Sequence, residues 1–339
     1  METSTPQFVL MGQLRREYTI LPSERVFLDV LAGNVLYAAI GVAIWEPEPH
    51  PALVARIGED YPQSWLEEFG EQGFDLRGIN ILPNEVDVRS FAAYTSRKSR
   101  TDEDPVSHFS RLGVPFPRAL LGYRSLSSQI DSKTNLSPTS LRQGDLIPAY
   151  SDATAAHICP MDFLTHSLIP AELRQAEFTT VTLDPAAGYM NPTFWSDLPS
   201  LVTGLTAFLP SEEELRYLFE GKSKDLWEMA DALASYGCEL IVIKRGEGGQ
   251  LVLDAAAHKR WEVTAYPSKM VDPTGAGDAF CGGFLAGFRR TYDPLEAALH
   301  GNISASLVVE GSGPLYALDA LPGLADARLE SLRQSVRIL

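Results

Sequence analysis

Short apolar runs that alternate with helix-type stretches form the clearest pattern along the second half of the chain. Four runs of strand length, bounded by Pro, Gly or Asp, are residues 155–158, 179–183, 207–209 and 240–243. The helix-type stretches between them are residues 171–177, 211–219 and 224–236. Strands and helices that alternate at this spacing favour βαβ crossovers. The chain is therefore predicted to be an α/β protein with a doubly wound, mainly parallel sheet flanked by helices.

The two ends of the chain extend this pattern. In the first half, strands are predicted at 8–11 and 52–57, and helices at 35–45 and 65–72. Towards the C-terminus, a hairpin is predicted from 251–253 and 261–265, and helices at 276–290 and 294–309. No internal repeat or linker interrupts these elements, so we predict a single domain over residues 1–339.

Residues 89–124 differ from the rest of the chain in charge. Seven Lys/Arg face three Asp/Glu there, a net charge of +4, and strand-like stretches at 90–94 and 119–123 flank a polar middle. We interpret the segment as part of a small β lid, formed by about 12–30 and 86–125. A solvated surface insertion is the alternative. Lid strands would have open edges, and pairing with the lid of a second subunit, in a homodimer, is one way to cover them.

Composition and charge narrow the classes of function and partner. The 339 residues are 45% hydrophobic and 21% charged, as in globular proteins. The net charge of −16 argues against nucleic acid and an anionic membrane as partners, because both require a cationic surface. Scattered cysteines, no secretory pattern and no apolar run of membrane-spanning length favour a cytoplasmic location. The six histidines lack zinc-ligand spacing.

The segment 271–288, VDPTGAGDAFCGGFLAGF, carries the clearest chemistry. Gly275, Ala276 and Gly277 form a small-residue turn that runs directly into a predicted helix. Unpaired N–H groups and the dipole at a helix start attract anions, and small residues let a phosphate approach closely. Asp278 falls in the first turn, where its carboxylate can accept a proton from an attacking hydroxyl. The pattern fits phosphoryl transfer; an ordinary helix start with an acidic residue is the alternative.

These residues begin a resemblance to a known family. Residues 272–280 resemble the C-terminal signature DTxGAGDxF of PfkB-type, ribokinase-like carbohydrate kinases. Further segments resemble motifs of that family in the same order: 56–60, 182–185, 210–214 and 244–249. The resemblance covers residues 8–315. It implies a ribokinase-like fold with a small β lid and an ATP-dependent phosphotransferase acting on a hydroxyl of a small sugar, nucleoside or related acceptor.

The resemblance also implies roles for the matching residues. Asp278 would be the general base, and the N–H groups of Gly275, Ala276 and Gly277 would form an anion hole. The implied cofactor-binding residues are Lys244, Gly246, Gly249, Thr274 and Asn302.

Two cation sites follow from the same resemblance. Glu214 and Asp184 would act through water on the Mg²⁺ that accompanies ATP, since Mg²⁺ prefers oxygen ligands and keeps several waters. Asp272 and Thr274, with backbone near Gly311, resemble a monovalent-cation site, which K⁺ would fill.

The segments that correspond to the family's acceptor-binding motifs, and Ser211, depart from the family pattern. Ser211 replaces an Asn, Arg15 and Arg16 stand near the place of a substrate-binding Asp, and Tyr37 replaces an Asn in the segment 32–39. The candidate acceptor-binding residues are Arg16, Gly33, Asn34 and Tyr37. We hypothesise that Arg15 or Arg16 meets an anionic or carbonyl group of the acceptor. Alternatively, both arginines are surface residues and Tyr37 belongs to the core.

Two other functions fit parts of the sequence. A catalytically inactive, ligand-binding or regulatory protein would keep the fold and tolerate Ser211, although the retained Asp278 argues against it. An NAD-dependent dehydrogenase would need a glycine fingerprint at the first βα turn, which residues 12–15 lack. Cys281 has no evident His partner and is interpreted as a packed helix residue.

Overall fold

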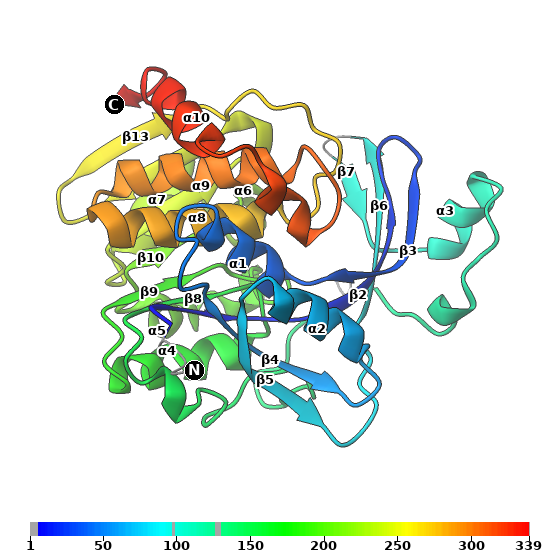
Figure 1. Ribbon diagram of the computed structural model, residues 1–339. Coiled ribbons are helices and arrows are strands. Elements are labelled where there is room, and N and C mark those ends of the chain that lie inside the picture. The colour runs from blue at the N-terminus through cyan, green and yellow to red at the C-terminus, as the bar shows by residue number, and fades with distance from the viewer. Residues whose placement is uncertain (1–5, 97–98, 126–129, 339) are drawn as a thin grey trace.

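The computed structural model describes residues 6–96, 99–125 and 130–338 (Figure 1). Its centre is a ten-stranded sheet in the order β14-β13-β12-β11-β10-β9-β8-β1-β4-β5. The strands are β1 (Phe8–Met11), β4 (Ala52–Gly58), β5 (Asp75–Leu82), β8 (Ala155–Ile158), β9 (Thr180–Leu183), β10 (Ala207–Phe208), β11 (Leu240–Lys244), β12 (Gln250–Asp254), β13 (Lys259–Val263) and β14 (Arg337–Ile338). All neighbouring strands from β11 through β10, β9, β8, β1 and β4 to β5 pair in parallel. The pairs β11–β12, β12–β13 and β13–β14 are antiparallel. The predicted mainly parallel sheet and its hairpin are confirmed.

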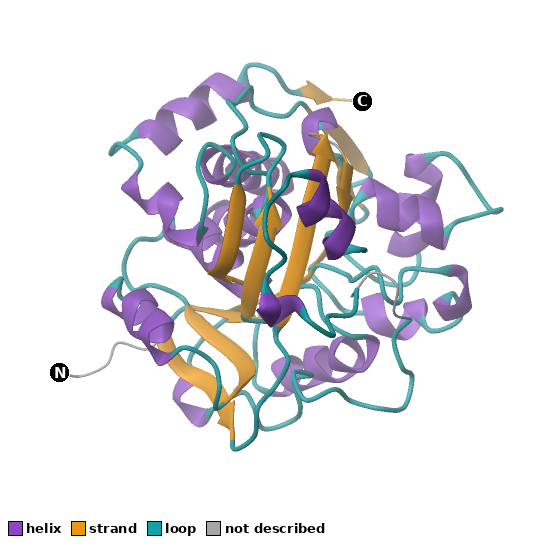
Figure 2. Ribbon diagram, turned by 90° about the vertical axis from the view of Figure 1, so that its right-hand side faces the viewer, coloured by secondary structure: helices purple, strands orange, loops and turns teal. Residues whose placement is uncertain are grey.

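Helices cover both faces of this sheet, and three apolar cores lie against it (Figures 1 and 2). Alternate residues of a buried strand point to opposite faces and so into different cores. In β1, Val9 and Met11 pack into one core, and Phe8 and Leu10 into another. The first core includes α4 (Phe163–Gln175), α5 (Leu198–Val202), α6 (Glu212–Leu218) and α7 (Leu226–Ala234). The second includes α1 (Asn34–Ala43), α2 (Gln63–Glu71), α8 (Ala276–Thr291), α9 (Pro294–Val308) and α10 (Leu324–Arg333). Over the described residues, no helix is long and apolar enough to cross a membrane.

Two elements differ from their predictions. Residues 118–120 form a single turn of 3-10 helix instead of a strand at 119–123, because Pro117 precedes them and Gly122 turns the chain at φ 73°. The helix predicted at 171–177 begins already at Phe163, where the Asp162 carboxylate accepts a hydrogen bond from the Thr165 N–H at 3.0 Å.

Helix α8 packs closely against α1, because glycines bring the two backbones together. A Cβ on Gly282 would lie 1.9 Å from the carbonyl oxygen of Ala38. A Cβ on Gly41 of α1 would lie 2.2 Å from the carbonyl oxygen of Ala279. Larger residues at either position would push the helices apart, so this packing fixes the start of α8 relative to the sheet.

A separate sheet of four strands projects beyond the end of β1 (Figure 1). Its order is β3 (Val26–Ala32), β2 (Arg15–Ile20), β6 (Arg89–Ser96) and β7 (Ser99–Thr101), with α3 (Pro105–Arg111) beside it. Tyr18, Ile20, Phe91 and Phe109 form its own apolar core. The predicted small second sheet is confirmed. Its strands lie within 12–30 and 86–125 except for the last two residues of β3, and its action as a lid stays a prediction.

Candidate active site

The start of α8, residues 275–278, is the α8 turn. Gly275 is the N-cap with φ 74°, and no side chain caps this helix end. A Cβ at Gly275 would lie 2.1 Å from Cγ of Tyr37, so only glycine fits against the ring. Tyr37 is buried in the core, and its ring packs against Gly275 of the α8 turn. Of the two interpretations offered for Tyr37, the structure supports the core residue.

Asp278 lies at the third position of α8, and its side chain is partly buried. Burial raises the pKa of Asp278 to about 6; the positive charges of Lys244 and Arg100 oppose this rise, and the charge on Glu17 adds to it. A carboxylate with this pKa is ionised at neutral pH and remains an effective proton acceptor. Asp278 therefore remains the candidate for the general base.

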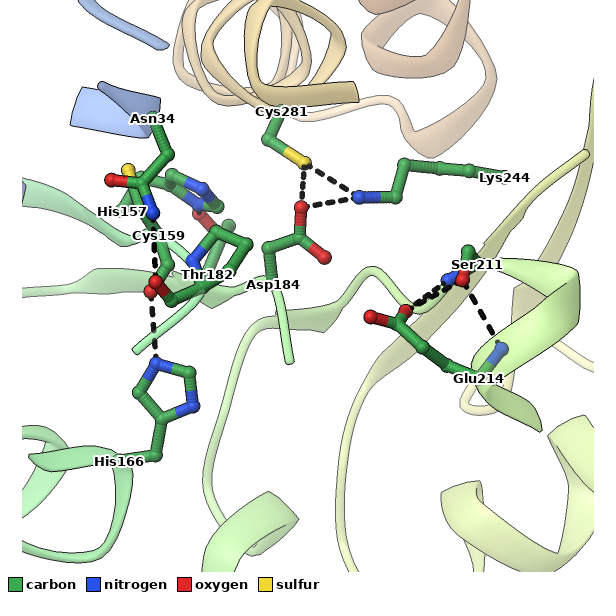
Figure 3. A network of polar contacts seen from close by, with 11 residues as sticks. Asn34, His157, Cys159, His166, Thr182, Asp184, Ser211, Glu214, Lys244 and Cys281 are labelled. Carbon is green, nitrogen blue, oxygen red and sulfur yellow. Dashed lines mark hydrogen bonds and ion pairs between the residues drawn. The ribbon is translucent and has the colours of Figure 1, made fainter. Parts of the chain in front are cut away.

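A buried ion pair from the ends of β9 and β11 lies beside the α8 turn (Figure 3). The Lys244 ammonium forms a salt bridge with Asp184 and lies 3.7 Å from the place a Cβ on Gly277 would occupy. Burial alone would lower the pKa of Lys244, but Asp184 and other acidic neighbours raise it overall, so the ammonium stays charged. The Cys281 thiol donates to Asp184 at 3.4 Å and lies 3.6 Å from the Lys244 nitrogen. Cys281, interpreted as helix packing, thus also contacts this ion pair.

Ser211 and Glu214 form a capping box at the start of α6 (Figure 3). The N–H and the hydroxyl of Ser211 donate to one Glu214 carboxylate oxygen, at 2.8 and 2.7 Å. Burial and the charge on Asp184 raise the pKa of Glu214 to about 7. Ser211 thus orients Glu214. Two mutually repelling carboxylates form a donor set that fits Mg²⁺ bound through water.

The turn after β11 holds the predicted nucleotide residues Gly246 and Gly249. Gly249 has φ 79°, and a Cβ there would lie 2.0 Å from the Val263 carbonyl oxygen, whereas a Cβ on Gly246 would meet open space. Asn302 is buried and donates its amide hydrogens to Gln250 Oε1 and to a main-chain oxygen after β13, at 2.8 Å each. Asn302 therefore fixes the surrounding main chain, and its place in the nucleotide site stays a prediction.

The loop before α8 contains the predicted monovalent-cation residues. The buried Asp272 accepts a hydrogen bond from the Thr274 N–H at 2.9 Å, and its own N–H donates to the Val309 carbonyl oxygen at 3.1 Å. The loops around 272 and 309 are therefore adjacent, as the predicted site requires, and cation binding stays a prediction. In the described part of the chain, no cluster of three or more His, Cys, Asp or Glu is arranged to hold a metal ion.

The alternation of side chains along β2 corrects the prediction for Arg16. The Arg16 guanidinium forms two hydrogen bonds with Asp29 of β3, at 2.8 and 2.6 Å. It lies on the same face as Tyr18, which packs into the second sheet's own core beside α3. Arg16 is therefore already paired and faces away from the α8 turn. The buried Glu17 lies on the opposite face, where its charge raises the pKa of Asp278.

Gly33 and Asn34, predicted to bind the acceptor, shape the start of α1. Gly33 has φ 136°, and a Cβ there would lie 2.2 Å from the Gln13 carbonyl oxygen. The Asn34 side chain accepts a hydrogen bond from the Gln13 N–H at 2.8 Å and donates to the Pro160 carbonyl oxygen at 2.7 Å. Asn34 thereby ties the loop after β1 to the loop after β8, which is a structural role.

Three residues that face the α8 turn from the second sheet were missed: Glu17, Tyr94 and Arg100. The Tyr94 hydroxyl contacts the Thr274 hydroxyl at 3.3 Å, and Arg100 lies opposite Tyr94 in the β6–β7 pair. The charge of Arg100 acts on both Glu17 and Asp278. Residues 15–20, RREYTI, form a strand, and side chains alternate between the two faces of a strand. Had this strand been predicted, the alternation would have placed Glu17 on the opposite face from Arg16.

Comparison with known proteins gives consistent results. Residues 164–321 match the model of the pfkB family carbohydrate kinases. The cytidine kinase of Thermococcus kodakarensis is 28% identical over 251 residues, which cover 70% of this chain and 73% of that protein. An E. coli protein assigned as a ribokinase II, solved with ATP and Mg²⁺, has a TM-score of 0.66 at 19% identity, covering 97% of this chain and 99% of its own. The nucleoside kinase of Burkholderia thailandensis, solved with inosine, has a TM-score of 0.64 at 16% identity. That comparison covers 96% of this chain and 98% of the kinase.

Proposed function

We propose that this chain, which carries a PfkB family carbohydrate kinase domain, transfers the γ-phosphoryl group of ATP to a hydroxyl of a small sugar or nucleoside. The observation that carries the proposal is the α8 turn, where Asp278 lies beside an uncapped helix start and Lys244. The similarity to a cytidine kinase and to a nucleoside kinase solved with inosine supports the acceptor class. The similarity to a protein solved with ATP and Mg²⁺ supports the phosphoryl donor.

In this mechanism the acceptor hydroxyl lies against Asp278. As its oxygen attacks the γ-phosphorus, the Asp278 carboxylate accepts the proton, and the bond from phosphorus to the bridging oxygen of ADP breaks. The N–H groups of residues 275–277 and the Lys244 ammonium stabilise the negative charge on the transferring group. These groups are held in place before the reaction by the packing of α8 and by Tyr37.

Asp184 and Glu214 would hold Mg²⁺ through water, and the bound ion would neutralise charge on the phosphates of ATP. The residues of the chain prepare this site in two ways. The salt bridge to Lys244 orients Asp184, and the capping box with Ser211 orients Glu214. The departure at Ser211 therefore keeps the carboxylate in a defined position, which supports turnover over a purely regulatory role.

Glu17 is the candidate for binding other hydroxyls of the acceptor. A carboxylate accepts several hydrogen bonds, and Glu17 faces Asp278 from β2. Burial raises the pKa of Glu17, whereas the charges of Arg100 and Arg15 oppose the rise. A polyhydroxylated acceptor such as a ribose or a hexose suits this environment. The hypothesis of an anionic or carbonyl group on the acceptor now rests on Arg15, which lies on the Glu17 face of β2, because Arg16 is paired with Asp29.

The test is ATP consumption by purified protein against a panel of sugars, sugar acids, polyols and nucleosides, with Mg²⁺ and K⁺ present. An Asp278→Asn variant is measured beside the wild type. Turnover of one acceptor class that is lost in the variant would support the kinase function. ATP binding without turnover of any acceptor would favour the regulatory alternative, and the absence of ATP binding would contradict the role of the α8 turn.

Other predictions from the sequence need separate measurements. Potassium activation is tested by replacing K⁺ with Na⁺ in the same assay. A homodimer through the second sheet is tested by sedimentation, with β3 and β7 as the edge strands of that sheet over the described residues. The cytoplasmic location stays a prediction until the protein is localised in cells.

A further inference from the structure

We propose that Arg100 is a further catalytic residue, which the second sheet presents to the α8 turn to stabilise charge on the transferring phosphoryl group. The inference rests on the proposed kinase function, because that function supplies the group. It assigns to the second sheet a direct part in catalysis, beyond covering the acceptor.

The pairing of β6 and β7 determines the direction of Arg100. Tyr94 and Arg100 lie directly opposite each other in this antiparallel pair, so their side chains project from the same face. From that face the Tyr94 hydroxyl reaches the Thr274 hydroxyl at 3.3 Å. Thr274 immediately precedes Gly275, the N-cap of α8. Arg100 therefore projects from the neighbouring strand towards the same turn.

Arg100 also differs from Arg16 and Arg89 of the second sheet in its partners. Arg16 is held by Asp29 at 2.6 Å, and Arg89 is held by Asp87 at 2.7 Å. The exposed side chain of Arg100 has no salt bridge or hydrogen bond with any residue the structure describes. A guanidinium that is close to carboxylates without being bound to one can bind an incoming anion.

The charges around Asp278 show where that anion would lie. Lys244, from the end of the main sheet, and Arg100, from the second sheet, both act on the Asp278 carboxylate. The transferring group spreads its negative charge over three oxygens. Lys244 and the N–H groups of the α8 turn approach from the side of the main sheet, so Arg100 would contact the oxygens that face the second sheet. The fork of donors on a guanidinium matches two phosphoryl oxygens.

The test compares Arg100→Gln with Arg111→Gln, a control at an arginine of the helix beside the same sheet. Arg111 lies in α3, is exposed, and contacts Glu24 at 3.3 Å, on the side away from α8 (Figure 1). Arginines that contact a transferring phosphoryl group contribute about 10³–10⁵ to kcat, and we expect about 10²–10³ for a partly solvated one. The KM values for ATP and acceptor should stay within a few-fold of wild type. Arg100→Lys should keep part of the activity, and added guanidinium ion should partly rescue Arg100→Ala.

Each outcome decides the proposal. Wild-type kcat in Arg100→Gln, or an equal loss in Arg111→Gln, would overturn it. A higher acceptor KM with unchanged kcat would also overturn it, because Arg100 would then bind the acceptor. If the wild type turned over no acceptor, the kinase function would fail separately. Affinity for ADP with aluminium fluoride, measured by calorimetry, would then decide: equal affinity in wild type and Arg100→Gln overturns the role, and a tenfold or greater loss, about 1.4 kcal/mol, supports it.

Discussion

Helices α8 and α10 begin with the same local structure. Each has a glycine N-cap in the left-handed region, Gly275 at φ 74° and Gly323 at φ 78°, and neither start has a side-chain cap. Each carries an aspartate at the third helical position, Asp278 and Asp326. At the level of local sequence, both are helix starts able to attract an anion.

The surroundings separate these two helix starts. A Cβ on Gly323 would meet nothing within 4 Å, and Asp326 is exposed. At Gly275 the Tyr37 ring fills the corresponding space, and Lys244 lies beside the turn. An aspartate at a helix start thus becomes a candidate base only where segments distant in sequence converge on it. Residues 275–278 therefore supply the helix start, and Tyr37 and Lys244, from distant segments, complete the candidate site around it.

The largest expected difference between the two helix starts is in catalysis. Asp278→Asn should lower kcat by about 10²–10⁴, because an amide cannot accept the hydroxyl proton. Asp326→Asn should leave kcat unchanged. Steady-state kinetics measures both, and calorimetry with ATP confirms that each variant still binds nucleotide. Equal losses in the two variants would show that the surroundings do not matter.

Glycine replacement at the two N-caps should affect folding unequally. Gly323→Ala only places an alanine in the left-handed region, at a cost of about 1–2 kcal/mol. Gly275→Ala pays the same conformational cost and also drives a methyl group into the Tyr37 ring, so we expect a loss above about 3 kcal/mol, or failure to fold. Urea unfolding of both variants gives the comparison, and similar midpoints would argue against the close packing of Tyr37.

The acid limb of the pH profile sharpens the comparison further. Asp278 must be ionised to accept a proton, and its pKa is raised to about 6, so kcat/KM should fall about tenfold per pH unit below pH 6. The Lys244 charge lowers this pKa, so Lys244→Gln should move the midpoint of the limb to higher pH. Measurement of kcat/KM from pH 4.5 to 8.5 tests both statements. An acid limb near pH 4 would contradict the effect of burial on Asp278.

The smallest expected effect is on stability without ligands. The pKa of Asp278 rises from 3.8 to about 6 on folding, so the folded state binds this proton more tightly. Stability from this group is present below pH 4 and is lost as the pH rises through 6. At pH 8 the wild type buries the charged Asp278 carboxylate, whereas the amide of Asp278→Asn is uncharged. The variant should therefore have a free energy of unfolding about 1–2 kcal/mol higher than wild type at pH 8, allowing for solvent screening. Denaturant unfolding at pH 8 and pH 3.5 measures this difference, which should vanish at the lower pH.

The fold could be predicted largely from the sequence because it depends on local periodicity. Alternating apolar runs and helical stretches predicted the parallel sheet, and residues 275–278 located the candidate base. The remainder depends on contacts between distant segments. Whether Arg16 or Glu17 faces the site is decided by the start of β2, and the position of Arg100 by its pairing with Tyr94. The buried hydrogen bonds of Asn302 likewise depend on residues far away in sequence.

The close backbone contact between α1 and α8 has a consequence for mutational scanning. Gly41 and Gly282 leave no room for a side chain, although both lie outside the turn that carries the chemistry. A growth-based scan would score them as intolerant, just as it would score Asp278. Cellular abundance would separate the two groups, because Gly282→Ala should deplete the protein whereas Asp278→Asn should leave its amount intact. Paired abundance and activity scores would therefore divide residues 271–288 into two groups. Positions in the first turn of α8 would lower activity alone, and the later positions would lower abundance.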